Sequence, residues 1–553
     1  MKTAGLLFVL LNTFSLSLLA QLIPLSVYEG DQCRLSKEEL GNKELFNTHT
    51  SIGRAMQGTV LPVLSSSAHV DILRIQCNNA EFYLHKPDSS ILGCQGIPIL
   101  KYFNTHPAHF FSSYGRHYYV TVDPLIQLSA GKQFHNENKL LTNRRGLKVS
   151  AGIDQKVYLY SEVTENQYSS YSFVNDYAGL YKAFPGAGFV KTYNSKVFGI
   201  SSGYDFIVAE GGVNFKASKH IAIQLGHGRN FIGQGIRSLL LSDFSPPQFN
   251  LKIQSEWGRF KYVNIFSELS KETRFINDRD HLLGKKYSAS HFLSYNITDH
   301  WNIGLFESVI FNRENMFELQ YLNPIILYRA VEQAVGSPDN ELLGFQSHVH
   351  IANRITLYGQ FILDEFVFNR LLKKNQGWWA NKYGFQLGAK YPEPFGVRGL
   401  YLQVEYNKVR PYTYSYADSI ADYSHYHQAL AHPLGSNFSE WVGTIQYEPA
   451  PRWFMSVSFM NYFKGIDGYL TNYGGNILKS YTTRQSDFNN KTGQGISRQV
   501  NQAQCRISYR LFRNSWLDLV SGVRTQYTEA IPDNYYWIEA GFRVYLNYRE
   551  FLF

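Results

Sequence analysis

The sequence predicts an all-β protein: a transmembrane antiparallel β-barrel of about 18 strands, with a small N-terminal segment that contains a helix. Three observations lead to this prediction. Residues 536–549 alternate between apolar and polar or small side chains, the period-two pattern of a strand between lipid and water. Aromatic residues make up 16% of a chain whose mean hydropathy is −0.27, which is typical of aromatic girdles around a polar interior. Strand-like segments are also joined by alternating short and long connections.

Residues 1–20 have the pattern of a secretory signal peptide. Lys2 gives the positive start, residues 6–19 are mostly apolar, and Ala20 precedes the expected cleavage point, although Leu18 is larger than the residue usual at that place. A short N-terminal membrane anchor is the alternative. No later stretch is apolar over the roughly 18 residues that a transmembrane helix needs. We therefore expect export to the outer membrane of a Gram-negative bacterium.

Residues 21–115 are expected to form a periplasmic cap or a plug in the barrel lumen. Residues 36–46 start like a helix, because Ser36 and Glu39 have the spacing of a capping box. An ordered arm without a role of its own is the alternative. Cys77 and Cys94 could form a disulfide in an oxidising compartment, and a pairing of Cys33 with either of them stays open.

Residues 116–553 are predicted to form the barrel, with both chain ends in the periplasm because the strand number is even. The short connections, such as residues 298–300, are expected in the periplasm, and the long ones, such as 410–439 and 464–499, outside the cell. The expected strands are residues 117–131, 145–152, 155–164, 205–215, 219–226, 249–256, 259–268, 288–297, 301–311, 344–351, 354–364, 382–390, 399–409, 440–447, 453–463, 500–511, 517–526 and 536–549.

The formal net charge is +9, yet no dense cluster of Lys and Arg is present. Because the chain is expected to be exported, we predict no nucleic-acid partner. A specific acidic ligand is one explanation of the positive charge. Arginines that are scattered in the lumen, together with contacts to membrane lipid and lipopolysaccharide, are an equally good explanation.

Four long connections carry the residues that we predict to bind a polysaccharide. They span residues 225–243, 321–344, 410–414 and 431–438, all on the expected external side. Their polar side chains suit sugar hydroxyls and carboxylates, and their tyrosine rings suit the apolar faces of sugars. Loops that only satisfy their own hydrogen bonds or pack together are the alternative. The candidates are His227, Arg229, Asn230, Gln234, Arg237, Asn323, Arg329, Glu332, Asn340, Arg410, Tyr412, Tyr414, His432, Asn437 and Glu440.

Neither catalysis nor a metal site is predicted. No nucleophile elbow accompanies the Ser and His residues of the long connections, and HExxH spacing is absent. His348 and His350 share one face of a strand, but no third ligand is apparent. We therefore expect no enzyme activity, no cofactor and no bound metal.

The same connections resemble the Wzi-type capsule-assembly family of outer-membrane proteins, in the form common in Bacteroidetes-like bacteria. The matching stretches are residues 143–166, 226–243, 322–344, 410–414 and 431–438, and the resemblance extends over about residues 100–553. It implies an eighteen-stranded barrel with a helical N-terminal element, and a lectin-like role in holding exported polysaccharide at the cell surface. The N-terminal segment departs from that pattern in its short helix and its cysteines.

We therefore expect a protein that binds or anchors a capsular or exopolysaccharide without chemical change. A porin-like channel for small or anionic solutes is one alternative, because arginines are expected to face the lumen. A scaffold of a surface secretion or gliding complex, with protein partners, is another, since members of the family differ in their roles.

Overall fold

The computed structural model describes residues 109–553, apart from residues 135–137, 155, 314–315, 326–327, 337–338, 353, 366–376, 451, 513 and 530. The expected signal peptide, the expected helix at residues 36–46 and the pair Cys77 and Cys94 lie outside the described residues. Among the residues that are described, no helix is long and apolar enough to cross a membrane.

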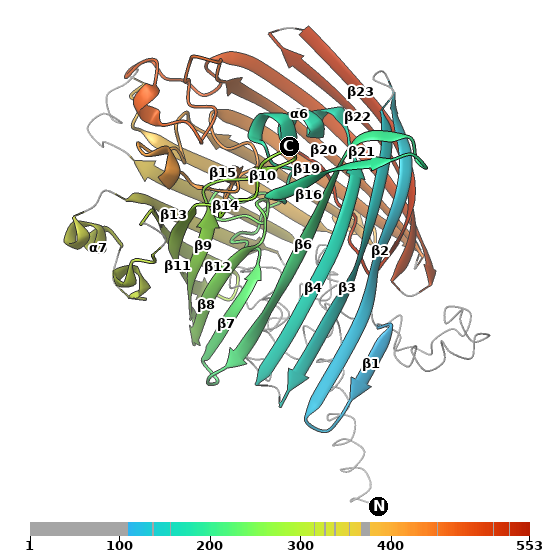
Figure 1. The fold of residues 1–553 in the computed structure, drawn as a ribbon. Helices are drawn as coiled ribbons and strands as arrows, with labels where there is room; N and C mark the ends of the chain where they lie inside the picture. The colour runs from blue at the N-terminus through green and yellow to red at the C-terminus, as the bar shows by residue number, and fades with distance from the viewer. Residues whose placement is uncertain are drawn as a thin grey trace, which may run out of the picture.

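A closed barrel of 18 antiparallel strands dominates the molecule (Figure 1). Each strand pairs with the next one, and the last pairs with the first, so that Glu539 lies opposite Gly131. The predicted fold class and strand number are confirmed, and every predicted strand overlaps one of these. The strands are β2 (Tyr118–Phe134), β3 (Lys139–Ile153), β4 (Val157–Ser169), β6 (Ile200–Lys216), β7 (Ile221–Gly228), β8 (Gln248–Trp257), β9 (Phe260–Ser270), β11 (Lys285–Thr298), β12 (Trp301–Phe311), β13 (Asn340–Ile351), β14 (Ile355–Glu365), β15 (Lys382–Pro392), β16 (Leu400–Val409), β19 (Phe438–Ala450), β20 (Trp453–Ile466), β21 (Ile496–Phe512), β22 (Ser515–Thr528) and β23 (Ile531–Val544).

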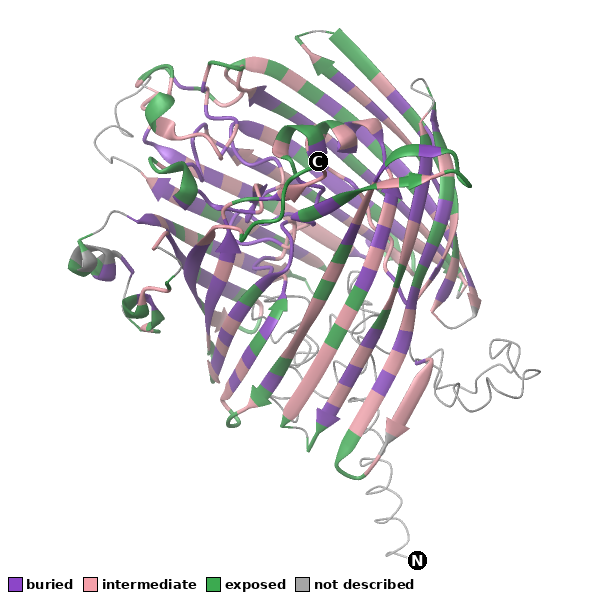
Figure 2. Ribbon diagram, in the orientation of Figure 1, coloured by how far each residue is buried: buried purple, intermediate pink, exposed green. Residues whose placement is uncertain are grey.

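Side chains alternate between the two faces of the barrel wall. On β23, Ile538 is exposed whereas Trp537 and Glu539 are buried, and Figure 2 shows the same alternation along the other strands. This apolar-out pattern is that of a barrel that crosses a membrane. The exposed apolar residues of this lipid face include Leu128, Leu147, Ile207, Leu225, Phe249, Leu305, Phe345, Leu387, Ile445, Val457 and Leu519.

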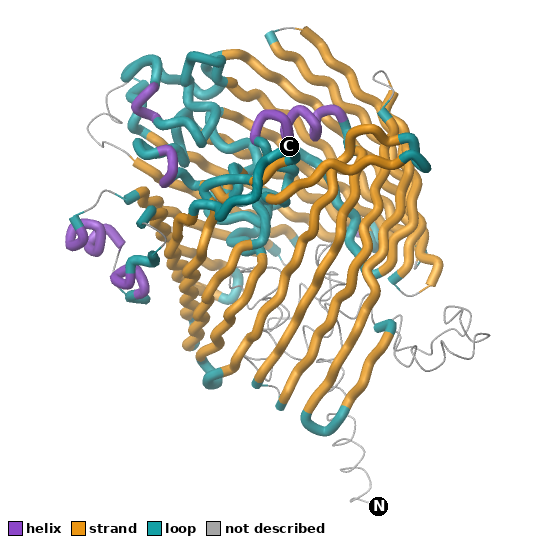
Figure 3. Tube along the Cα trace, viewed as in Figure 1, coloured by secondary structure: helices purple, strands orange, loops and turns teal. Residues whose placement is uncertain are grey.

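The connections between strands differ in length at the two ends of the barrel. Short turns such as residues 217–220 and 258–259 lie at one end, which we call the short-turn end. Residues 229–247, 410–437 and 467–495 lie at the other, the long-loop end, where Figure 3 shows the loops and helices gathered. The predicted alternation of short and long connections is confirmed.

The last strand ends earlier than the sequence predicts. β23 stops at Val544 rather than at Arg549, and Tyr545 has a φ of 52°, which turns the chain away from the strand. Residues 545–553, the C-terminal segment, then run back through the lumen, so that Phe553 lies inside the barrel (Figure 1).

Two residues that the alternating pattern assigns to the lipid face lie inside the barrel for this reason. Leu546 packs in a cluster with the inward-facing Leu125, and the ring of Tyr548 lies 5.1 Å from the guanidinium of Arg506.

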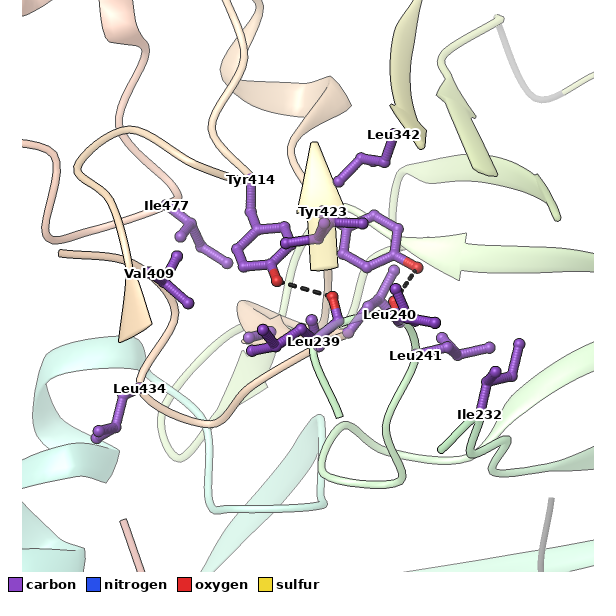
Figure 4. Packing of buried hydrophobic residues seen from close by; sticks show 14 of the residues in the cluster. Ile232, Leu239, Leu240, Leu241, Leu342, Val409, Tyr414, Tyr423, Leu434 and Ile477 are labelled. Atoms are coloured by element: carbon purple, nitrogen blue, oxygen red, sulfur yellow. Dashed lines mark hydrogen bonds between the residues drawn. The ribbon is translucent and has the colours of Figure 1, made fainter. Parts of the chain in front are cut away.

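The apolar core lies inside the barrel at the long-loop end. Residues 229–247 and 410–437 fold inward, and Leu240 and Tyr423 pack there with inward-facing wall residues (Figure 4). A second cluster joins α6 (Ser172–Tyr181) to the C-terminal segment, where the ring centroid of Phe173 lies 6.0 Å from that of Phe553. The inside of the barrel at this end is therefore packed with apolar side chains, as well as with the polar ones that the sequence predicts.

Candidate functional site

Arg237, on the inward-folded connection 229–247, meets Glu440 of β19 inside the barrel. Its guanidinium lies 3.1 Å from one carboxylate oxygen of Glu440, and Nε2 of His432 lies 2.7 Å from the other. Asn407 donates to the same carboxylate at 3.1 Å. Burial lowers the pKa of His432, and the adjacent carboxylate opposes that shift. Three predicted ligand residues are thus brought together, but they bind one another.

Arg410 and Tyr412 tie neighbouring connections together at the long-loop end. Arg410 donates to the main-chain oxygens of Asn381 at 2.7 Å and Trp378 at 3.3 Å. The hydroxyl of Tyr412 donates to the main-chain oxygen of Asn472 at 2.9 Å. Both predicted residues therefore hold loops in position.

Tyr414 and Asn437 join further loops in the same way. The hydroxyl of Tyr414 donates to the main-chain oxygen of Leu239 at 2.7 Å (Figure 4). The side chain of Asn437 donates to the main-chain oxygen of Gln494 at 2.9 Å and accepts from the amide of Gly493 at 2.7 Å. Tyr414 and Asn437 are buried, which keeps these hydrogen bonds away from competing water.

The glycine-rich connection is also bonded to its surroundings. Arg229 forms an ion pair with Glu210 of β6 and donates to the main-chain oxygen of Ser245 at 3.1 Å. The side chain of Gln234 accepts from Lys390 at 3.2 Å. Asn230 is buried, and its side chain has no hydrogen-bond partner within the described part of the chain.

The remaining candidates lie in the barrel wall or in another connection. β7 continues to Gly228, so His227 is in the wall, on the exposed register opposite Phe249, rather than in a loop. Asn340 begins β13 and donates to the main-chain oxygen of Ala421 at 2.8 Å inside the barrel. The connection 312–339, which includes α7 (Tyr328–Val335), lies beside the outer wall (Figure 1). It carries Asn323, Arg329 and Glu332.

An aromatic cluster at the long-loop end is missing from the sequence candidates. The ring centroids of Trp379 and Tyr481 are 4.7 Å apart, and those of Trp378 and Phe488 are 5.0 Å apart. The guanidinium of Arg484 lies 4.1 Å from the ring centroid of Trp379. Phe488 is 38% exposed, and the other four residues are half-buried. We call Trp378, Trp379, Tyr481, Arg484 and Phe488 the external aromatic patch.

The polar groups of the external aromatic patch have defined states and orientations. Burial raises the pKa of Tyr481 to about 12, still further above neutral pH than the ordinary value of a tyrosine. Asp487 accepts from Nε of Arg484 at 2.6 Å, which orients the guanidinium over the indole of Trp379. Adjacent tryptophans at positions 378 and 379, in a long connection, are the sequence signal that could have revealed this cluster.

No protein-family model matches the chain, and no curated protein sequence matches it. Solved structures with a similar fold are outer-membrane β-barrels. One of them is Wzi of Escherichia coli, which is described as a carbohydrate-binding β-barrel involved in group 1 capsule assembly. It is 11% identical to this chain with a TM-score of 0.47, and the match covers 76% of this chain and 85% of Wzi. OprD of Pseudomonas aeruginosa is 11% identical with a TM-score of 0.40, over 77% and 95%. OccAB1 of Acinetobacter baumannii is 9% identical with a TM-score of 0.39, over 77% and 96%.

Proposed function

We propose that this protein lies in the outer membrane and binds a surface polysaccharide through the external aromatic patch. The position of Arg484 supports this function most directly. Its guanidinium lies 4.1 Å from the ring centroid of Trp379, and the Trp379 ring in turn lies beside the ring of Tyr481. Aromatic faces suit the apolar faces of sugars, and an adjacent arginine suits a hydroxyl or a carboxylate. The patch stands at the long-loop end, which faces outward in bacterial barrels.

Two of the candidate residues predicted from the sequence hold this surface in position. Arg410 binds the main-chain oxygen of Trp378, and the ring centroid of Tyr412 lies 6.5 Å from that of Trp379. Loops that are already fixed lose less conformational entropy when a ligand binds. In this proposal Arg410 and Tyr412 act by holding the patch in shape.

Binding of the purified full-length protein to the polysaccharides of its own cell tests the proposal. Trp379→Ala combined with Tyr481→Ala should weaken binding about tenfold or more, because two ring faces are lost. Phe395→Ala is the matched control, since Phe395 is an aromatic residue at the short-turn end that is 87% exposed. Unchanged binding by the double variant would remove the patch from the proposal.

A channel for small anionic solutes is the second candidate, favoured by inward-facing arginines on β21 and β22. The C-terminal segment occupies two of them, since Arg506 lies over Tyr548 and Arg524 donates to the main-chain oxygen of Phe553 at 2.8 Å. Planar-bilayer recordings separate the candidates. Polysaccharide binding without transport predicts no sustained current, whereas a steady current that anionic solutes block would favour the channel.

A further inference from the structure

The described residues of the connection 312–339 lie against the outside of the barrel instead of folding into the lumen. We call these residues the wall lobe; they contain η3 (Leu319–Leu322) and α7. The amide of Tyr328 donates to the Glu307 carboxylate on β12 at 2.8 Å. The ring centroid of Tyr321 lies 4.7 Å from that of Phe311, and that of Phe317 lies 5.1 Å away. Aromatic packing and a charged acceptor thus hold the wall lobe against β12.

Three polar residues of the outer wall lie beneath the wall lobe. Asn264, His291 and Glu307 are direct cross-strand neighbours on β9, β11 and β12. All three point away from the lumen, since the neighbouring residue Phe292 belongs to the inner core. They are nevertheless buried. The ring centroids of His291 and Tyr328 are 4.1 Å apart, so α7 covers this polar row.

The height of this polar row places it within the hydrocarbon layer. Trp301, an exposed aromatic residue at the short-turn end of β12, marks the lower interface. Glu307 follows six residues later, which at about 3.4 Å per residue and a tilt of about 40° is about 15 Å higher. The apolar band of such barrels is about 25 Å tall. A polar row at that height has a large free-energy cost unless protein covers it.

The wall around the wall lobe is apolar and exposed. Leu343 lies directly opposite Glu307 in the sheet, and Leu305 lies two residues below it on the same face. These side chains are 46% and 57% exposed, respectively. The wall lobe therefore docks at a level where the barrel itself is in contact with lipid.

The outer surface of the wall lobe continues this apolar face. Ile325 is 84% exposed, Leu319 is 73% exposed and Leu322 is 38% exposed. Arg313 forms a bidentate pair with Asp339, with distances of 3.0 Å and 2.8 Å, and lies 3.7 Å from Glu318, so the charges of the three side chains largely offset one another.

We propose that the wall lobe is immersed in the membrane, with Leu319, Leu322 and Ile325 in contact with lipid acyl chains. It acts as a second layer of the barrel wall that separates Asn264, His291 and Glu307 from lipid. The connection that the sequence assigns to polysaccharide binding is then a lipid-binding element.

Photo-crosslinking from within the wall lobe tests this proposal. The photoreactive residue p-benzoylphenylalanine replaces Leu322 or Ile325 in the full chain, which is reconstituted into vesicles of phosphatidylethanolamine and phosphatidylglycerol. The same residue at Leu305, on the exposed wall, is the positive control. At Tyr469, which is 98% exposed at the long-loop end, it is the negative control.

The yield of lipid adducts at positions 322 and 325 should match the yield at position 305 and exceed that at position 469 by about tenfold. This difference is expected because apolar side chains at positions 322 and 325 would lie in the hydrocarbon layer. Mass spectrometry of the irradiated protein gives the yields. A yield at both positions as low as that at 469 would place the wall lobe in water and overturn the proposal. Crosslinks mainly to a second copy of the chain would overturn it as well, in favour of a protein interface.

Discussion

Arg524 on β22 donates to the main-chain oxygen of Phe553 at 2.8 Å and so joins the barrel wall to the C-terminal segment. The same guanidinium lies 4.4 Å from the ring centroid of Phe173 in α6 and donates to Gln502 of β21 at 2.7 Å. One buried arginine therefore connects the wall, a helix inside the long-loop end and the C-terminal segment.

Arg524→Ala should lower the free energy of unfolding by about 2–4 kcal/mol, because hydrogen bonds to a buried charge are lost and their acceptors stay buried. Urea unfolding in vesicles measures this. Arg145→Ala is the control, since Arg145 pairs with Glu165 on the exposed face, and such pairs contribute about 0–1 kcal/mol. Equal losses in the two variants would contradict the connecting role of Arg524.

Phe551→Ala should destabilise the barrel because it removes a contact that the C-terminal segment makes inside the lumen. The ring centroid of Phe551 lies 5.8 Å from that of Phe184 and 6.1 Å from that of Tyr171. Removing a buried phenylalanine ring costs about 3–5 kcal/mol. Thermal unfolding in detergent would report the loss, and Tyr469→Ala, at an exposed position, should change stability by less than about 0.5 kcal/mol. A neutral Phe551→Ala variant would mean that residues 545–553 do not pack inside the barrel.

Glu440→Gln should leave the guanidinium of Arg237 buried beside a neutral amide. Breaking one side of a buried ion pair costs about 3–5 kcal/mol in the free energy of unfolding. Adding Arg237→Met should recover part of that loss, because the unpaired charge is then removed. Urea unfolding of both single variants and the double variant measures the coupling. Strictly additive losses would show that the two side chains do not interact.

His425 should make the barrel less stable in acid. It accepts from the amide of Ser270 at 2.9 Å, and its Nε2 lies 3.3 Å from the main-chain oxygen of Pro247. Burial lowers the pKa of His425 to about 3. The unfolded chain therefore takes up a proton below a pH of about 6.5 while the folded chain does not, and stability falls as the pH drops from there towards 3.

His425→Gln should remove this contribution, so that the free energy of unfolding falls less between pH 7 and pH 4, by on the order of 2–3 kcal/mol. Urea titrations at the two pH values give the difference. His281→Gln removes a histidine at an exposed position and should change the pH dependence much less than His425→Gln does. A slope unchanged in His425→Gln would show that this imidazole is protonated in the folded chain.

The barrel wall could be predicted because each strand has one face towards lipid and one towards the interior, and this difference leaves its own alternating pattern in the sequence of every strand. Ile538 faces outward and Trp537 inward for a reason that is visible in residues 536–549 alone. The same pattern does not reveal where β23 ends, because Leu546 and Tyr548 continue the alternation. Their position inside the barrel depends on Leu125 and Arg506, which are distant in the chain.

The candidate site was less predictable, because a polar side chain in a loop has no fixed partner until the loops meet. Arg237 looks like a ligand-binding residue, but its partner Glu440 is 203 residues away and is buried with it. Trp379 and Tyr481 likewise come from separate connections, and only their contact creates the external aromatic patch.

The sequence by itself determined the barrel, its eighteen strands and the difference between its two ends, because each follows from the local alternation of side chains and the lengths of the connections. Only the tertiary structure decided which connections fold inward, which one covers the wall and which polar groups stay exposed. The physical reason is that a buried hydrogen bond or ion pair needs a partner at a defined position, and three-dimensional packing alone supplies that position.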